Sequence, residues 1–262
     1  MKILLISGHG AGDPGAAATI DGTYYQESQE ARRVTAALKP LLQKYADVDI
    51  YPTSRNAFYD VCNGVLGNYA NIGSYDYVLE VHFNAFTPQY ADGQTKGVEC
   101  YVTNSEAGTT VEQLICQYIS QVGMQNRGVK RYDWSVIYNV KLYGVSSALL
   151  EVCFIDDPDD MHVYTQNFDS IVSAIAKGVV EGFELGSIKM EDESKPNEDK
   201  NEEEEDDMTV YKTLEDVPEW ARPTVEKLIE KKYLVGEGEG VLNLEHNMLR
   251  GLVINNNAGL YD

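Results

Sequence analysis

The chain has 262 residues, 43% of them hydrophobic, and its 42 acidic and 21 basic residues give a formal net charge of −21. This apolar content allows a sizeable core, and the length predicts one large domain with room for a small one. The negative charge excludes phosphate backbones, and therefore nucleic acid, as a partner.

No apolar run approaches the roughly 18 residues of a membrane span, so we expect no membrane-spanning segment. The apolar block near the start, ILLI, is too short for a signal peptide, which predicts synthesis in a cytoplasm. Four cysteines lie in apolar runs without a CxxC pair, a pattern typical of reduced, buried thiols: Cys62, Cys100, Cys116 and Cys153.

The first 185 residues alternate between two apolar patterns. Short apolar runs predict strands at 2–7, 48–51, 75–83, 97–103 and 146–154. Helical spacing predicts helices at 27–45, 57–72, 109–125 and 158–184, the last with a break near Phe168. The segments 127–130 and 134–138 give weaker signals, which we interpret as strand or loop. The alternation predicts an α/β fold whose central sheet is largely parallel or mixed and is flanked by helices.

The composition changes abruptly after residue 185. Residues 186–208 hold almost nothing apolar and include the run NEDKNEEEEDD, which predicts a flexible acidic linker. Apolar patterning returns in 209–262, with a helix that places Ala221, Val225, Leu228 and Ile229 on one face and a second apolar element at 248–254. We expect a small, mainly α-helical domain, and so short a unit is marginally stable alone, which favours a second copy that covers its apolar face.

Two histidines occupy equivalent places in the predicted sheet. His9 follows the first strand within SGHGAGDPGAAA, and His82 lies near the end of the strand YDYVLEVHF. If the two strands are parallel, both imidazoles emerge at the carboxyl edge of the sheet, where α/β proteins build their sites. Taken alone, His9 fits a structural role in a turn as well as it fits a metal ligand. Taken alone, His82 fits a hydrogen-bonded core histidine better than a ligand. His162 and His246 lack comparable neighbours.

A catalytic zinc site needs three protein ligands and one open position, so two histidines leave one ligand to find. The nearby acids are Asp13, Glu27 and Glu30. Glu27 opens the first helix, Glu30 is its rival almost a turn later, and Asp13 suits the turn formed by Asp-Pro-Gly.

Glu151 interrupts the apolar strand ALLEVCF, and a charged residue there is costly unless it has a partner or a task. It could accept a proton from zinc-bound water. Alternatively, it is the buried ion-pair partner of a nearby cation: Arg127, Lys130 or Arg131.

These segments together resemble the zinc-dependent N-acetylmuramoyl-L-alanine amidases of the bacterial cell wall. The resemblance rests on GHGAGDPGA, a glutamate opening the next helix, VHFNA, RGVKRYD and ALLEVCFIDDPDD, in the same order across residues 1–185. It departs from the family at Phe83 and Ala31, where a small and a polar residue are usual, and both changes could alter the groove.

The resemblance implies that His9, Glu27 and His82 bind Zn²⁺, that Glu151 is the catalytic glutamate, and that Asn84 either supports the ligands from behind or fixes the adjoining loop. The implied reaction is hydrolysis of the amide between the lactyl group of N-acetylmuramic acid and L-alanine of the stem peptide in peptidoglycan. Two alternatives stay open, namely a zinc peptidase that cuts within the stem peptide and a non-catalytic wall-binding protein.

Residues 209–262 more loosely resemble a single S-layer-homology motif, through a Trp-Ala pair opening a helix, a Gly-rich loop and an arginine in the second apolar element. This implies wall attachment, to a secondary wall polysaccharide, and the alternative is a homo-oligomerisation module. The absence of a signal peptide favours a bacteriophage endolysin of a Gram-positive host, which reaches the wall once the membrane is breached.

Overall fold

Six strands form the central sheet of the larger of two units, Met1–Asp192. The computed structural model describes residues 1–86, 95–188, 210–218, 221–234 and 242–245, together with four single residues, Leu249, Leu252, Val253 and Asn256. Within these ranges no helix is both long and apolar enough to cross a membrane.

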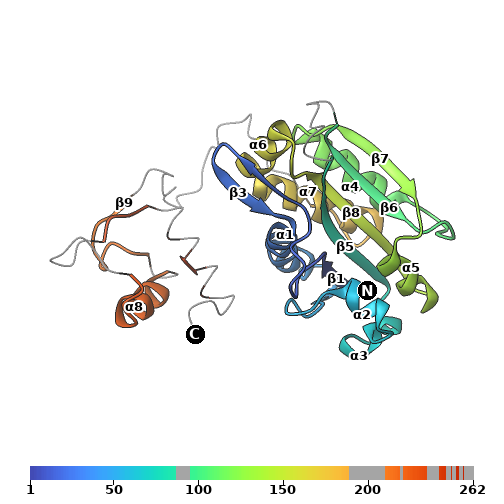
Figure 1. Cartoon of the computed structure of the whole chain (residues 1–262), viewed down its shortest axis with the longest axis horizontal. Helices are drawn as coiled ribbons and strands as arrows, with labels where there is room; N and C mark the ends of the chain where they lie inside the picture. The colour runs from blue at the N-terminus through green and yellow to red at the C-terminus, as the bar shows by residue number, and fades with distance from the viewer. Residues whose placement is uncertain are drawn as a thin grey trace. The chain divides into compact units, whose positions relative to one another are not determined.

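The strand order places three strand ends side by side at one edge of the sheet. The order is β4 (Asp47–Ile50), β1 (Lys2–Ser7), β5 (Tyr77–Asn84), β8 (Ser146–Phe154), β6 (Val98–Val102) and β7 (Asn126–Arg131). β6 pairs antiparallel with β8, and all the other pairs of this sheet are parallel. The predicted α/β fold with a mixed central sheet is therefore confirmed, and β1, β5 and β8 end at a common edge (Figure 1).

Helices cover both faces of the sheet (Figure 1). One face packs against α1 (Glu27–Leu42), α4 (Thr110–Gln121) and α7 (Phe168–Gly182), with α6 (Pro158–Gln166) at its edge. The opposite face packs against the short helices α2 (Ala57–Cys62), α3 (Leu66–Tyr69) and α5 (Ser135–Leu142), followed after α3 by a 3-10 turn, Ile72–Ser74. The break near Phe168 separates α6 from α7, as the sequence predicts.

Three local predictions were wrong or incomplete. The weak segment 134–138 begins a helix, α5, because Val136, Ile137 and Val140 share a buried side with helical spacing that extends beyond the segment. The predicted helix 57–72 is broken, because Gly64 takes a left-handed φ of 66°. The hairpin of β2 (Ala17–Ile20) and β3 (Thr23–Gln26) was missed, although its Asp-Gly turn is a hairpin signal.

All four thiols are free, and Cys62 is exposed rather than buried, since it ends α2 on the solvent side. The two positions that depart from the family pattern do not line a groove. Phe83 and Ala31 are both fully buried in the core, and the Phe83 ring packs edge-to-face on Tyr164 at 5.0 Å.

The smaller unit, Glu193–Asp262, has its own apolar cluster. β9 (Val210–Tyr211) pairs antiparallel with β10 (Leu244–Glu245), and α8 (Arg222–Glu230) buries Val225 and Leu228. Ile229 is 37% exposed and so does not share that buried face, contrary to the prediction. Most of the predicted linker, 189–208, lies outside the described residues, as do His246 and much of 248–254.

Candidate metal centre and catalytic glutamate

The loop after β1 brings His9 to the end of β5. Gly8 donates its backbone N–H to the carbonyl of Val81 at 2.8 Å, which continues the β1–β5 ladder, and His9 then turns into the left-handed region with φ 58°. Gly8 is required because a Cβ there would lie 2.4 Å from Cε1 of His82. The glycine before the histidine is therefore what allows the two imidazoles to approach.

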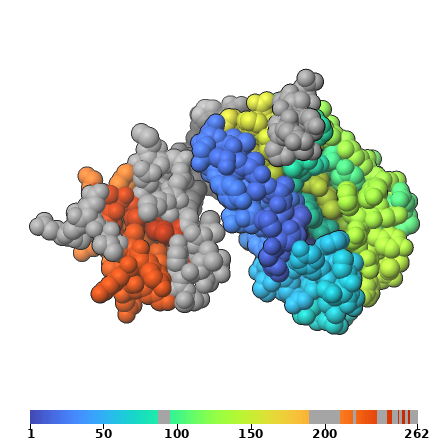
Figure 2. Space-filling model, viewed as in Figure 1, coloured from blue at the N-terminus to red at the C-terminus, as the bar shows by residue number. Residues whose placement is uncertain are grey.

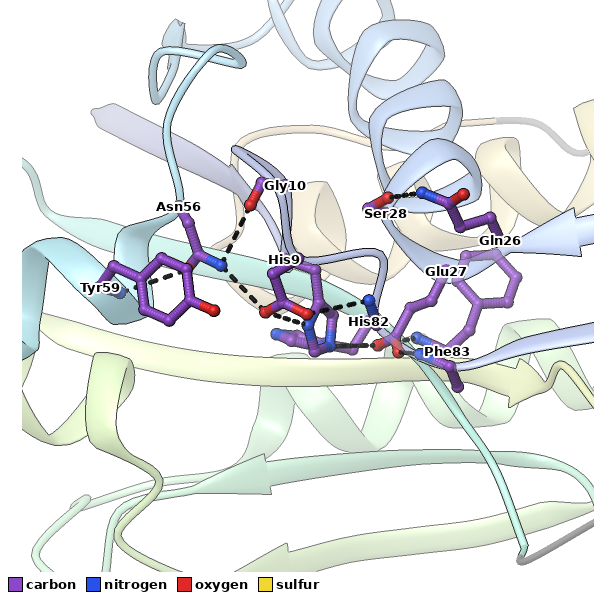
Figure 3. A network of polar contacts seen from close by, with 12 residues as sticks. His9, Gly10, Gln26, Glu27, Ser28, Asn56, Tyr59, His82 and Phe83 are labelled. Carbon is purple, nitrogen blue, oxygen red and sulfur yellow. Dashed lines mark hydrogen bonds and ion pairs between the residues drawn. The ribbon is translucent and has the colours of Figure 1, made fainter.

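Three side chains converge on one point at this edge of the sheet (Figure 3). Oε1 of Glu27 lies 3.1 Å from Nε2 of His9 and 2.8 Å from Nδ1 of His82. The ligand atoms of the three residues lie within 4.8 Å of one another. Glu27 reaches this point from the first residue of α1, and its carboxylate also accepts the backbone N–H groups of Phe83 at 3.2 Å and Ala16 at 2.8 Å.

Each imidazole has a second carboxylate on its other nitrogen. Nδ1 of His9 lies 2.9 Å from Oδ2 of Asp13, and Nε2 of His82 lies 3.1 Å from Oε1 of Glu80. The second contact is an ion pair without hydrogen-bond alignment. Asp13 also accepts the backbone N–H of Gly15 at 3.1 Å, so it shapes the turn as predicted and holds His9 as well. Carboxylates in these positions orient imidazole rings.

Glu151 lies beside this group on β8. Its Cα pairs with that of His82 on one side and with that of Glu99 on the other. Its Oε2 is shut off from solvent and has no hydrogen-bond partner within the described part of the chain. An unpartnered buried carboxylate oxygen is costly, and such atoms are concentrated at functional sites.

The cations that could have neutralised Glu151 bind elsewhere. Arg127 donates from Nε to Oε2 of Glu99 at 2.6 Å, and Lys130 ion-pairs with the same oxygen. Arg131 donates to backbone carbonyls, among them that of Glu106 at 2.8 Å. Neither the hydrogen bonds nor the ion pairs of these residues involve Glu151, so the ion-pair alternative for it is not what the structure contains.

The buried charges perturb one another. Burial, together with repulsion from nearby carboxylates, raises the pKa of Glu151 to about 8 against the opposing attraction of His82. Burial also opposes ionisation of Glu27, but hydrogen bonds from His82 and His9 outweigh it and hold its pKa at about 2. Burial would lower the pKa of His82, yet attraction by Glu80 and the bond to Glu27 raise it well above its ordinary value.

The remaining candidate residues contact other partners and do not join the group of His9, Glu27 and His82. Asn84 donates from its side-chain amide to Oε1 of Glu99 at 2.9 Å, so it supports the carboxylate next to Glu151 rather than an imidazole. Glu30, the rival ligand, accepts the Tyr164 hydroxyl at 2.8 Å and lies outside the group. His162 is paired with Asp21 at 2.6 Å, away from it.

Sequence reasoning missed Glu80 and Glu99, which are 4% and 1% exposed. The signal was present, because each interrupts an apolar strand just as Glu151 does. What the sequence did not contain was their register against His82 and Glu151.

Comparison with known proteins decides the family. The sequence profile of the N-acetylmuramoyl-L-alanine amidase family matches residues 3–181. The chain belongs to this family. The chain is 27% identical over 204 residues to a probable autolysin of Staphylococcus aureus and 24% identical over 187 residues to an uncharacterised Clostridium perfringens protein. Each alignment covers 71% of the chain but only 40% and 53%, respectively, of the relative, so the chain spans about half the length of these relatives.

Solved structures show the same fold. The catalytic domain of the CD27L endolysin, which targets Clostridium difficile, has a TM-score of 0.53 at 24% identity, covering 69% of the chain and 97% of that domain. The catalytic domain of CwlV, an N-acetylmuramoyl-L-alanine amidase of Bacillus (Paenibacillus) polymyxa, has a TM-score of 0.57 at 20% identity, covering 71% and 100%. At these identities the likeness concerns the fold of the larger unit.

Proposed function

We propose that the chain is a zinc-dependent amidase that hydrolyses the bond between the lactyl group of N-acetylmuramic acid and L-alanine of the peptidoglycan stem peptide. One observation carries the proposal. His9 and His82 turn one nitrogen each toward a single oxygen of Glu27, and Glu151, whose Oε2 has no hydrogen-bond partner among the described residues, lies beside them. Family membership supports the substrate class.

The donor set fits zinc. Two imidazole nitrogens and one carboxylate oxygen, all within 4.8 Å, are a ligand set that a catalytic zinc takes, with a fourth position left for water or substrate. His9 would bind through Nε2 and His82 through Nδ1, because their other nitrogens face Asp13 and Glu80. When bound, zinc polarises the scissile carbonyl and lowers the pKa of its water. Metal binding displaces the protons that the two imidazoles hold.

Glu151 would move the proton. A nearby cation lowers the pKa of a carboxyl group, and burial raises it, so the loaded site holds Glu151 between these two effects and suits it for accepting a proton from water. Its Oε2 would take that proton and then deliver it to the departing alanine nitrogen. The neighbouring Glu99 binds Asn84, Arg127 and Lys130, which leaves the Glu151 carboxylate free to accept a proton.

The Glu151→Gln variant tests this role. Glutamine has nearly the same shape but cannot accept the proton, so we expect the variant to retain stoichiometric zinc and the native fold and to lose most of its turnover. Removal of one general base typically costs about 10²–10⁴-fold. Near-normal wall lysis by a variant that still holds its zinc would contradict the assignment.

We further propose that the chain is an endolysin of a bacteriophage that infects a Gram-positive host, synthesised in the host cytoplasm and acting once the membrane is permeabilised. We assign wall attachment, through a secondary wall polysaccharide, to 209–262 as an S-layer-homology-like unit, with self-association as the alternative. Wall attachment is tested by co-sedimentation of the full chain with walls, before and after removal of that polysaccharide. Self-association is tested by sedimentation of the protein alone.

A further inference from the structure

A group of aromatic rings lies on the sheet beside the candidate site. Trp134 stacks edge-to-face on Tyr101 with ring centroids 5.8 Å apart and lies 4.7 Å from the ring of Tyr132. Tyr132 is 54% exposed and Trp134 is 42% exposed, whereas Tyr101 is half-buried beneath them. We call these three residues the aromatic platform. Adjacent large rings left in water are a feature of binding surfaces rather than of ordinary protein surface.

The platform is held rigidly. Tyr132 donates its backbone N–H to the carbonyl of Val102 at 2.9 Å, and Trp134 donates to the carbonyl of Tyr132 at 2.9 Å. Asp133, between the two rings, accepts both the backbone and side-chain N–H groups of Asn104, at 2.9 and 2.8 Å. The rings are therefore positioned before any ligand arrives, which reduces the ordering cost of binding.

Strand register places the platform next to the catalytic carboxylate. Glu99 pairs with Glu151 across β6 and β8, and Tyr101, two residues further along β6, pairs with Leu149. Tyr101 is thus the diagonal neighbour of Glu151 on the same face, a relation that separates Cα atoms by about 7–8 Å. Figure 2 shows the blue N-terminal segment and the green β6–β7 segment on the same face of the larger unit, with atoms of intermediate colour between them.

The groups around the rings suit a polar ligand with an apolar face. The Tyr101 hydroxyl donates to Glu99 at 2.9 Å, and the Lys130 ammonium lies 5.5 Å from the centre of the Tyr101 ring. Pyranose rings have this character, since one face presents C–H groups and the edge presents hydroxyl and acetamido groups. In the proposed substrate, the sugar is joined through its lactyl group directly to the bond that is cut, so a sugar ring must lie within a few ångströms of Glu151.

We propose that the aromatic platform is a subsite for N-acetylated sugar rings of the glycan strand, which stack on Trp134 and Tyr132. The subsite rests on the proposed amidase function, because that function places a sugar next to the scissile bond. It extends the function by assigning recognition of the glycan, rather than of the peptide, to β6, β7 and the start of α5.

A binding experiment tests the subsite independently of catalysis. The chain has two tryptophans, so the full-length Trp220→Phe, Glu151→Gln protein reports on Trp134 alone. Titration with peptide-free glycan strands should change its emission saturably. Adding Tyr132→Ala should weaken the fitted affinity about tenfold, the loss of one aromatic contact. The matched control is Tyr143→Ala, which removes a 53%-exposed ring at the far end of α5 and should leave the affinity unchanged.

Kinetics provide the second readout. On walls, Trp134→Ala should raise KM about tenfold with little change in kcat, and on a lactyl-L-alanyl peptide without sugar it should leave kcat/KM unchanged. Equal losses on both substrates, or no emission change with glycan, would overturn the subsite. So would a dimer that Trp134→Ala dissociates, in a protein that binds no glycan, because a second copy would then be the occupant. If no amidase product forms from either substrate while the glycan titration succeeds, the proposed function fails and the subsite stands.

Discussion

Glu151→Gln should make the metal-free protein more stable at alkaline pH, although it removes the group that we assign to catalysis. The pKa of Glu151 is about 8 in the folded protein, against an ordinary value of 4.5, because the carboxylate is buried among other acids. The folded state therefore keeps a proton that the unfolded state has lost. It follows that this carboxyl group stabilises the fold fully below pH 4.5, and that the stabilisation is lost as the pH rises toward 8. Glutamine carries no such penalty.

The size of the effect follows from the same two pKa values. At about 1.4 kcal/mol for each pH unit between them, the cost of ionising Glu151 at pH 9 is at most about 5 kcal/mol. Buried sites respond as though their dielectric constant were well above that of dry protein, which reduces this cost. We therefore expect ionisation of Glu151 at pH 9 to cost about 2–3 kcal/mol. The free energy of unfolding of the Glu151→Gln variant should exceed that of the parent by this amount at pH 9 and by little at pH 4.5.

Urea unfolding in the presence of chelator, at pH 4.5 and pH 9, measures the difference. Glu99→Gln is the matched control, because Glu99 lies opposite Glu151 but its pKa is lowered: burial opposes ionisation, and hydrogen bonds from Lys130 and Arg127 outweigh it. That variant should be less stable than the parent at pH 9. A Glu151→Gln gain that is the same at both pH values, or a loss at pH 9, would refute the electrostatic reasoning.

Three further predictions concern the metal and the domains. Asp13→Ala and Glu80→Ala should each weaken zinc binding about 10–100-fold in a chelator competition, with the fold retained by circular dichroism; unchanged affinity would remove their orienting role. Gly8→Ala should lower zinc content and melting temperature, because the new Cβ would lie 2.4 Å from the His82 imidazole. The control Gly73→Ala should change neither, because a Cβ at that position has no heavy atom of another secondary-structure element within 4 Å. A chain ending at Asp192 should keep its turnover of soluble muramoyl peptides and be retained on walls more weakly than the full chain; retention equal to that of the full chain would contradict the role of 209–262.

The fold was largely predictable because its signals are local. Apolar runs of strand length marked β1, β4, β5, β6 and β8. The place of His9 and His82 at strand ends was enough to predict that they meet. α5 was not predictable from 134–138, because its β-branched residues favour a strand and its buried spacing becomes visible only when Val140 is included.

The candidate site was predictable only in part, because its details depend on register. Spacing alone left Asp13, Glu27 and Glu30 as rival ligands. Only tertiary contacts separate them, since the backbone N–H groups of Ala16 and Phe83 hold the Glu27 carboxylate between the imidazoles. Glu80 was recognisable as a charge within an apolar strand, but its contact with Nε2 of His82 needs coordinates.

The chemistry of the products formed from purified walls tests the central claim most directly. Walls digested by the zinc-loaded protein should acquire new amino termini of L-alanine, seen by mass spectrometry, and release no internal stem-peptide ends. The same digest with chelator should yield neither, and added zinc should restore the first. New ends within the stem peptide, or L-alanine termini formed equally well under chelation, would contradict a metal-dependent amidase built on His9, Glu27, His82 and Glu151.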